Sequence, residues 1–177
     1  MNATIQMEKS DSQAPRDADR AEQEARDDPR DRARRELVAF RAADQDFCVD
    51  IMSIREIRGF TAATVVPHAP DYVLGVMNLR GSVVPVVDLS RRLGLGATEG
   101  DDRHVIIIAM VGPQMTGLLV EAVSDILSIP EDEIRPTPEV ASEAARGFIS
   151  GVICEGERLL RLVDLSRLLP AEQGAQP

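Results

Sequence analysis

The sequence predicts a mainly β protein, a pair of small packed β-barrels with short helices, preceded by a disordered arm. From Glu36 onward, short apolar runs alternate with turn residues, which is typical of many short strands in a sandwich or barrel. The segment 75–94 ("GVMNLRGSVVPVVDLSRRLG") also returns 76 positions later as 151–169 ("GVICEGERLLRLVDLSRLL"), which indicates a duplicated unit. Two copies are too few for a solenoid, so a pair of barrels is the simpler arrangement.

Residues 1–35 are expected to form the disordered arm. Charged and small residues dominate this segment, so it cannot bury enough apolar surface to offset the entropy lost on ordering. A solvated tail is the simplest interpretation, and the alternatives are a weak docking or solubilising role and a transient helix in 16–36. The folded domain is expected to cover 36–170, followed by a flexible tail at 171–177.

Each half of the domain is expected to contain a hairpin, a further strand and one copy of the repeated block. Pro85 has no amide donor, so its strand is expected to lie at a sheet edge or to carry a bulge. The expected strands of the first half are 37–40, 46–51, 53–60, 64–67, 72–79 and 82–89, and those of the second are 104–110, 116–121 and 122–129, followed by the second copy of the block.

Asp88 and Asp164 occupy the same place in the two copies, between an apolar strand and a short leucine-containing stretch. A carboxylate in this position favours an N-cap for a helix of one or two turns. Neither residue has a histidine or a second carboxylate at ligand spacing, so we interpret both as caps rather than metal ligands. Gly94 and Pro170 are the expected helix stops.

Composition excludes several classes of function. The formal net charge is -10, and residues 37–177 contribute -8 of it, from 20 acids and 12 bases. An acidic surface repels phosphate backbones, and aromatic residues make up only 3% of the chain, so nucleic-acid binding is not expected. No apolar run reaches the roughly 18 residues of a membrane span. We therefore expect a soluble, cytoplasmic protein.

The chain shows no recognisable catalytic or metal-binding pattern. His68 is expected in a surface loop and His104 at a strand end, without partner ligands at a recognisable spacing. Cys48 and Cys154 lie inside apolar segments, which suits small buried side chains better than a disulfide or a metal clamp. We expect no cofactor, and the composition is that of a scaffold rather than an enzyme.

Two polar features need another explanation. "NLRG" places Arg80 at a hairpin tip, and its counterpart in the second copy is Gly156. Whatever both copies share is explained by folding, so the unshared arginine is free to serve recognition, although an ordinary solvated turn is the alternative. Alternation places Ile54 and Glu56 on one side of a strand, which is either a contact surface or a plain strand.

Four segments in series resemble the CheW chemotaxis coupling proteins: "VDIMSIREIRGF", "PDYVLGVMNLRGSVVPVVDLSRRLGL", "GLLVEAVSDILSIPEDEIRPTPE" and "ISGVICEGERLLRLVDLSRLL". The resemblance covers roughly 36–170. It implies two five-stranded barrels, SH3/OB-like, around separate cores. It also implies a non-catalytic adaptor that joins the cytoplasmic tips of methyl-accepting chemoreceptors to the regulatory domain of the histidine kinase CheA.

The resemblance also implies which residues meet these partners. Gly75 and Gly117 have a competing interpretation, in which the backbone needs glycine for a turn or for close packing. The arm has no counterpart in the resemblance. The implied contact positions are Ile54, Glu56, Gly75, Arg80, Val105 and Gly117.

The sequence leaves three alternative functions to consider. The same adaptor could serve type IV pili or another output instead of flagella, and the sequence does not separate these. A CheV-like protein carries a receiver domain after the coupling domain, and the expectation is that a chain ending at Pro177 leaves no room for one. A small barrel enzyme is the most remote alternative.

Deleting residues 1–34 should leave the melting temperature of the domain nearly unchanged, because a disordered arm has no packing to lose. Thermal unfolding followed by circular dichroism measures this. A loss of several kcal/mol of stability would instead show that the arm packs on the domain.

Overall fold

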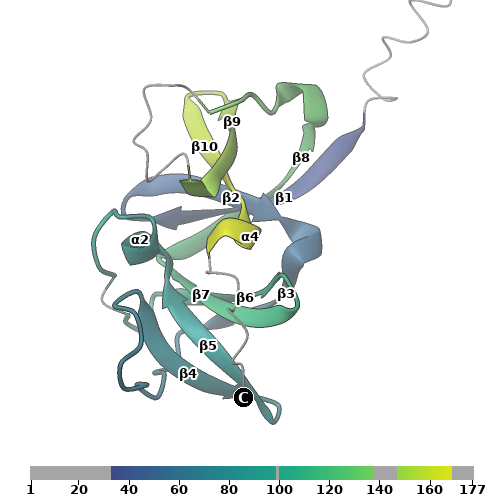
Figure 1. Ribbon diagram of the computed structural model, residues 1–177. Helices are drawn as coiled ribbons and strands as arrows, with labels where there is room; N and C mark the ends of the chain where they lie inside the picture. The colour runs from purple at the N-terminus through teal and green to yellow at the C-terminus, as the bar shows by residue number, and fades with distance from the viewer. Residues whose placement is uncertain (1–32, 99, 138–146, 169–177) are drawn as a thin grey trace, which may run out of the picture. The chain divides into compact units, whose positions relative to one another are not determined.

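The computed structural model describes residues 33–98, 100–137 and 147–168, and within them the fold is mainly β, as predicted. Two five-stranded sheets have the strand orders β8-β1-β2-β10-β9 and β3-β6-β7-β5-β4, and we call them barrel A and barrel B (Figure 1). Barrel A contains β1 (Arg34–Ala42), β2 (Gln45–Asp50), β8 (Ala122–Pro130), β9 (Ile149–Glu155) and β10 (Arg158–Val163). Barrel B contains β3 (Ile54–Gly59), β4 (Val73–Leu79), β5 (Ser82–Asp88), β6 (Val105–Val111) and β7 (Gln114–Val120).

Within the part of the chain that the structure describes, four short helices with complete bounds join these strands. The α-helices α2 (Leu89–Arg92) and α4 (Leu165–Leu168) follow β5 and β10, and Figure 1 shows both of them between the two sheets. The 3₁₀-helices are η1 (Ile51–Ser53), which leads from barrel A into barrel B, and η2 (Glu131–Glu133), which follows β8. The structure reproduces the 76-residue offset of the repeat. The first and last residues of β4 and β9 are each 76 positions apart in the sequence, and so are those of α2 and α4.

The repeats are not the barrels, and this corrects the expected arrangement of two consecutive units. The β1–β2 hairpin of the first repeat pairs with β8 and β10 of the second, antiparallel and parallel respectively. The β6–β7 hairpin of the second repeat likewise pairs with β3 and β5 of the first. The two repeats have exchanged hairpins, so neither half of the chain contains a complete barrel.

Three clusters of buried side chains hold the described part of the fold together. One lies within barrel A and one within barrel B, each with seven buried residues, represented by Leu160 and Val84. The third contains 17 buried residues drawn from both barrels and both α-helices, including Phe40, Ile107 and Leu168. The separate cores that were expected are both present, but the shared cluster is the largest of the three.

Helix capping follows the prediction. The Asp88 carboxylate accepts a hydrogen bond from the Arg91 amide at 3.1 Å, and the Asp164 carboxylate accepts one from the Ser166 amide at 3.0 Å. Gly94 stops α2 with φ of 74°, and its amide bonds to the Arg91 carbonyl at 3.0 Å, as in a Schellman motif. The other predicted stop, Pro170, lies outside the described residues.

Four expectations about strands and burial need correction. β1 begins at Arg34, so two residues assigned to the arm belong to the sheet. The segment 64–67 is not a strand and contributes one isolated bridge, from Thr64 to Val76. Cys48 is buried as expected, but Cys154 is exposed because it alternates with the buried Ile153 along β9.

The strand that carries Pro85 lies inside its sheet, between β4 and β7, rather than at an edge, and the irregularity in the β4–β5 pairing lies on β4, between Val73 and Gly75. Pro85 is tolerated because β5 pairs with β7 only over Val86 to Asp88, beyond the proline. At Pro85 itself, β4 is the only neighbour given by the strand pairing, so the missing amide costs no second ladder bond.

Gly75 on β4 and Gly151 on β9 are equivalent glycines. Next to each of them, the strand forms an isolated bridge to a segment that closes the barrel, at Thr64 in barrel B and at Arg135 in barrel A. The amide of Val76 bonds to the Thr64 carbonyl at 2.8 Å, and the amide of Val152 bonds to the Arg135 carbonyl at 2.8 Å. A Cβ atom on Gly75, whose φ is 146°, would lie 2.2 Å from the Thr64 carbonyl oxygen. The backbones therefore approach too closely for any side chain at this position.

Gly75→Ala should lower the free energy of unfolding by about 3 kcal/mol, because the new methyl group clashes with backbone that cannot rotate away. Urea denaturation measures this. Gly59→Ala is the matched control, since a Cβ there meets nothing within 4 Å, and it should change stability by less than about 0.5 kcal/mol. Equal stability of the two variants would contradict the closure argument.

Candidate partner-binding site

Arg80 and Glu56, two of the predicted contact residues, meet at one end of barrel B. Arg80 Nη2 lies 2.5 Å from Glu56 Oε2. The β4–β5 loop positions the arginine, since Arg80 and Gly81 have φ of 51° and 90°, as a type I′ turn requires. Asn78 Oδ1 accepts the Gly81 amide at 2.8 Å and fixes the turn. The "NLRG" motif is thus a hairpin tip that aims the arginine at Glu56.

This ion pair leaves most of the arginine available. The Arg80 side chain is 81% exposed and the Glu56 side chain 24%, and Arg58 lies 3.9 Å from the other Glu56 oxygen. Exposed ion pairs contribute little to stability, and one bond to Glu56 leaves further guanidinium donors facing solvent. The pair therefore orients a fork of donors toward solvent more than it stabilises the barrel.

Barrel A has a counterpart of this pair, which sequence comparison at a fixed offset missed. Glu56 pairs with Ile108, three residues before the end of β6, and Asp125 pairs with Ala39, three residues before the end of β1. The two carboxylates are equivalent, and Arg158 reaches Asp125 at 3.4 Å. Both barrels therefore pair an arginine with the equivalent carboxylate. The sequence analysis selected Arg80 because the second copy has no arginine at the counterpart position, and that argument is not sufficient.

The two arginines nevertheless differ in how far they are engaged. Arg158 also lies 3.2 Å from Asp46 and 3.7 Å from Glu155, and its side chain is 37% exposed. The hydrogen bond to Asp46 is the main reason that the pKa of Arg158 is raised. Arg158 is thus surrounded by carboxylates of its own barrel, whereas Arg80 has one principal partner. Availability, rather than presence in one copy, distinguishes Arg80.

The other four predicted contact residues lie closer to the interior. Ile54 and Val105 are half-buried and pack against the shared cluster. Gly75 is buried at the closure of barrel B, and Gly117 is buried where a Cβ atom would lie 3.0 Å from the Ile106 side chain. Packing accounts for both glycines, and a contact role for these four residues stays a prediction.

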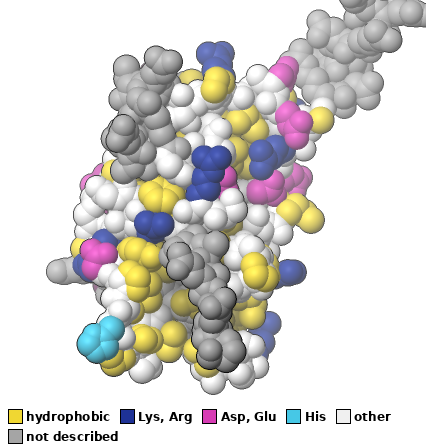
Figure 2. All heavy atoms as spheres, in the orientation of Figure 1, with side chains coloured by type: hydrophobic (Ala, Val, Ile, Leu, Met, Phe, Trp, Pro, Cys, Tyr) yellow, Lys and Arg dark blue, Asp and Glu magenta, His cyan; other side chains and the backbone are white. Residues whose placement is uncertain are grey.

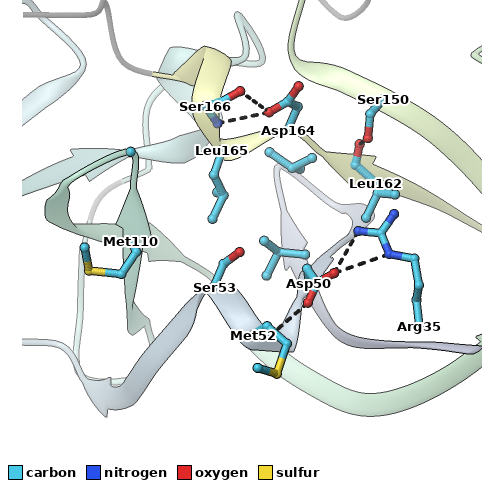
Figure 3. A pocket seen from close by; sticks show the side chains of 13 residues that line it. Arg35, Asp50, Met52, Ser53, Met110, Ser150, Leu162, Asp164, Leu165 and Ser166 are labelled. Carbon is cyan, nitrogen blue, oxygen red and sulfur yellow. Dashed lines mark hydrogen bonds and ion pairs between the residues drawn. The ribbon is translucent and has the colours of Figure 1, made fainter.

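A cavity of about 550 Å³ lies between the barrels, and sequence reasoning did not find it. Figure 3 shows Arg35, Asp50 and Leu162 of barrel A on one side and Met110 of barrel B on the other. Its lining comes from segments spread between residues 35 and 166, and the hairpin exchange brings them together. No local sequence motif predicts the cavity.

The cavity combines charged groups with apolar ones. Arg35 Nη2 donates to Asp50 Oδ2 at 2.8 Å, and Asp50 Oδ1 accepts the Met52 amide at 2.9 Å. Burial alone would raise the pKa of Asp50, but the Arg35 and Met52 hydrogen bonds outweigh it and the pKa is lowered. Leu162 and the 85% exposed Met52 supply apolar surface. Such a lining suits an amphipathic segment of a partner.

The remaining titratable candidates fall where the sequence predicted. His68 is exposed in a loop, and His104 directly precedes β6 with its Nδ1 2.7 Å from Asp101 Oδ1. Among the residues that the structure describes, no group of three or more His, Cys, Asp or Glu could hold a metal ion. The described helices include none long and apolar enough to cross a membrane.

Figure 2 shows one face of the molecule, on which basic side chains lie near the level where the two barrels meet and apolar side chains gather over barrel B. The exposed apolar residues of barrel B include Val65, Val66 and Val83. Apolar side chains next to charged ones are typical of surfaces that bind other proteins.

Comparisons with known proteins agree with this fold. The family model for the CheW-like domain matches residues 36–173. Chemotaxis protein CheW of Rhizobium meliloti is 55% identical over 139 residues, which are 78% of this chain and 90% of that protein. Chemotaxis protein CheW of Klebsiella aerogenes is 36% identical over 140 residues, covering 79% and 84%.

A crystal structure of the scaffolding protein TtCheW from Thermoanaerobacter tengcongensis is also similar, with a TM-score of 0.73 and 27% identity over 81% of this chain and 98% of that one. The region matched by the family model includes all of barrel B with the Arg80–Glu56 pair, and barrel A except for the first two residues of β1. The chain therefore belongs to the CheW family of chemotaxis scaffold proteins.

Proposed function

We propose that this protein is a non-catalytic cytoplasmic adaptor that couples the tips of methyl-accepting chemoreceptors to the regulatory domain of the histidine kinase CheA. Family membership supports a chemotaxis scaffold in general. The observation that carries the finer proposal is the presence of two separate partner-type surfaces: the exposed Arg80–Glu56 tip of barrel B and the cavity between the barrels. An adaptor needs two such surfaces.

The Arg80 tip suits recognition of a carboxylate or a carbonyl oxygen. Glu56 holds one guanidinium nitrogen at 2.5 Å, so less side-chain entropy is lost when the remaining donors bind a partner. Val83 lies two residues beyond the turn on β5 and is exposed. Apolar contacts near the tip supply affinity, and the arginine sets register and partner choice.

The inter-barrel cavity suits a segment with one apolar and one polar side. Its apolar lining lies between the Arg35–Asp50 pair and Asp164, whose carboxylate accepts the Ser166 hydroxyl at 2.5 Å. An amphipathic helix presents this combination. Receptor transitions then control the kinase only by changing interaction free energies with the adaptor, since a partner that contacts both signalling states equally shifts neither.

Arg80→Ala should leave the fold intact and lower the affinity of the adaptor for its partners by about tenfold, so receptor-dependent activation of kinase autophosphorylation should weaken. The rate of kinase autophosphorylation in a reconstituted mixture of receptor, kinase and adaptor measures this. Arg103→Ala is the matched control, because Arg103 is an equally exposed arginine paired with Asp101 at 3.0 Å. Normal activation by a folded Arg80→Ala protein would refute the assignment of Arg80 as a contact.

The double variant Glu56→Arg with Arg80→Glu separates the two roles of the pair. If the ion pair only stabilises barrel B, exchanging the charges preserves it and function returns. If the Arg80 donors bind a partner, the exchange presents a carboxylate instead, so kinase activation should be lost although the melting temperature stays nearly unchanged. Full recovery of activation would contradict a direct contact by Arg80.

A further inference from the structure

Arg92 makes an unusual contact between the two barrels. It is the last residue of α2, and its guanidinium carbon lies 4.6 Å from the ring centroid of Tyr72 and 4.5 Å from that of Phe148. Its Nε donates a hydrogen bond to the Leu168 carbonyl at the end of α4. One side chain thus joins Tyr72, which directly precedes β4 of barrel B, to Phe148, which directly precedes β9 of barrel A, and to Leu168, the last residue of the helix that follows β10.

The partners of Arg92 are related by the sequence repeat. Tyr72 and Phe148 differ by 76, and so do Arg92 and Leu168. Their backbones are also equivalent, because the Tyr72 carbonyl accepts the Asp88 amide and the Phe148 carbonyl accepts the Asp164 amide, each at 2.8 Å. The contact therefore lies where equivalent parts of the two repeats face each other, and only one repeat supplies an arginine.

The helix α4 connects this contact to the inter-barrel cavity. Asp164, Leu165 and Ser166 line the cavity at the start of the helix, and Leu168 receives the Arg92 hydrogen bond at its end. Leu165 and Leu168 are both buried in the shared cluster. A four-residue helix is a single turn, so a shift of its last residue moves the wall of the cavity as well.

We propose that Arg92 is a latch between the barrels, and that the latch sets their relative orientation and the shape of the inter-barrel cavity. Its regulatory consequence rests on the proposed function, in which the cavity receives a partner segment. Closing the latch organises the cavity, and opening it disfavours partner binding. A guanidinium between two rings is suited to this role, because its planar faces stack on both while its edge donates the hydrogen bond.

Arg92→Lys is the informative variant, because lysine keeps the charge but loses the planar stacking and the Nε donor. Arg161→Lys is the matched control. Arg161 also stacks on an aromatic ring, that of Phe47 at 5.7 Å, but both residues belong to barrel A. Both variants weaken one cation–π contact, and only Arg92→Lys weakens a contact between the barrels.

Spin labels measure the inter-barrel distance directly in the full chain. Cys154 on barrel A is exposed and accepts one label, and Val83→Cys on barrel B, at another exposed position, accepts the second. Cys48 should stay unlabelled, because it is buried and burial raises the pKa of its thiol to about 12. Double electron–electron resonance then reports the distribution of distances between the barrels.

The parent and Arg161→Lys should each give one narrow distance distribution, and Arg92→Lys a broadened or shifted one. Arg92→Met keeps an unbranched side chain but removes the charge and the donors, and it shows whether a change seen with Arg92→Lys is peculiar to lysine. Unchanged distributions in both Arg92 variants would overturn the latch, whatever the protein binds.

A second measurement tests the link to the cavity. Without spin labels, Arg92→Lys should bind a soluble chemoreceptor cytoplasmic fragment about fivefold more weakly than Arg161→Lys, a change typical of coupling between sites. If the distance distribution of Arg92→Lys is broadened but Arg92→Lys and Arg161→Lys bind the receptor fragment equally well, the regulatory role is overturned. A parent protein that binds no receptor fragment would refute the proposed function, and the distance measurement would still decide whether the latch exists.

Discussion

The burial of the shared cluster is the constraint on which the rest of the structure depends. Strands of both barrels carry apolar side chains on both faces: on β7, Leu118 and Val120 enter the shared cluster while Leu119 enters the core of barrel B. A closed barrel covers only its inner face. The outer face needs a second barrel, so pairing of the barrels is a condition of folding rather than a later association.

The exchange of hairpins also matters for function, because it affects how the barrels can move relative to each other. Since each repeat supplies a hairpin to the other barrel, the two repeats cannot separate without breaking strand pairs, and the chain crosses between the barrels twice, at η1 and between β7 and β8. The two crossings and the shared cluster limit changes in the relative orientation of the barrels to small rotations. In such a frame, a contact between the barrels such as that of Arg92 can bias the cavity without unfolding either barrel.

The sequence predicted the duplicated barrels, the β4–β5 hairpin and both helix caps, because these depend on local apolar patterns and on single residues such as Asp88. The hairpin exchange could not be predicted, since exchanged and unexchanged barrels have the same order of elements along the chain. The cavity depends on that exchange and was missed with it. The ion pair between Glu56 and Arg80 could not be predicted from the sequence either. The two residues are 24 positions apart, and only the closed barrel brings their side chains together.

Equivalent positions in the repeats show how a duplicated fold diversifies. An arginine meets the equivalent carboxylate in both barrels, yet it comes from the turn in one and from the strand in the other, at Arg80 and Arg158. The strand arginine is enclosed by carboxylates, and the turn arginine keeps donors in solvent. Of the two forms, the turn form leaves more hydrogen-bond donors unengaged. A residue is thus marked for recognition by its unengaged hydrogen-bonding capacity, rather than by its absence from the other copy.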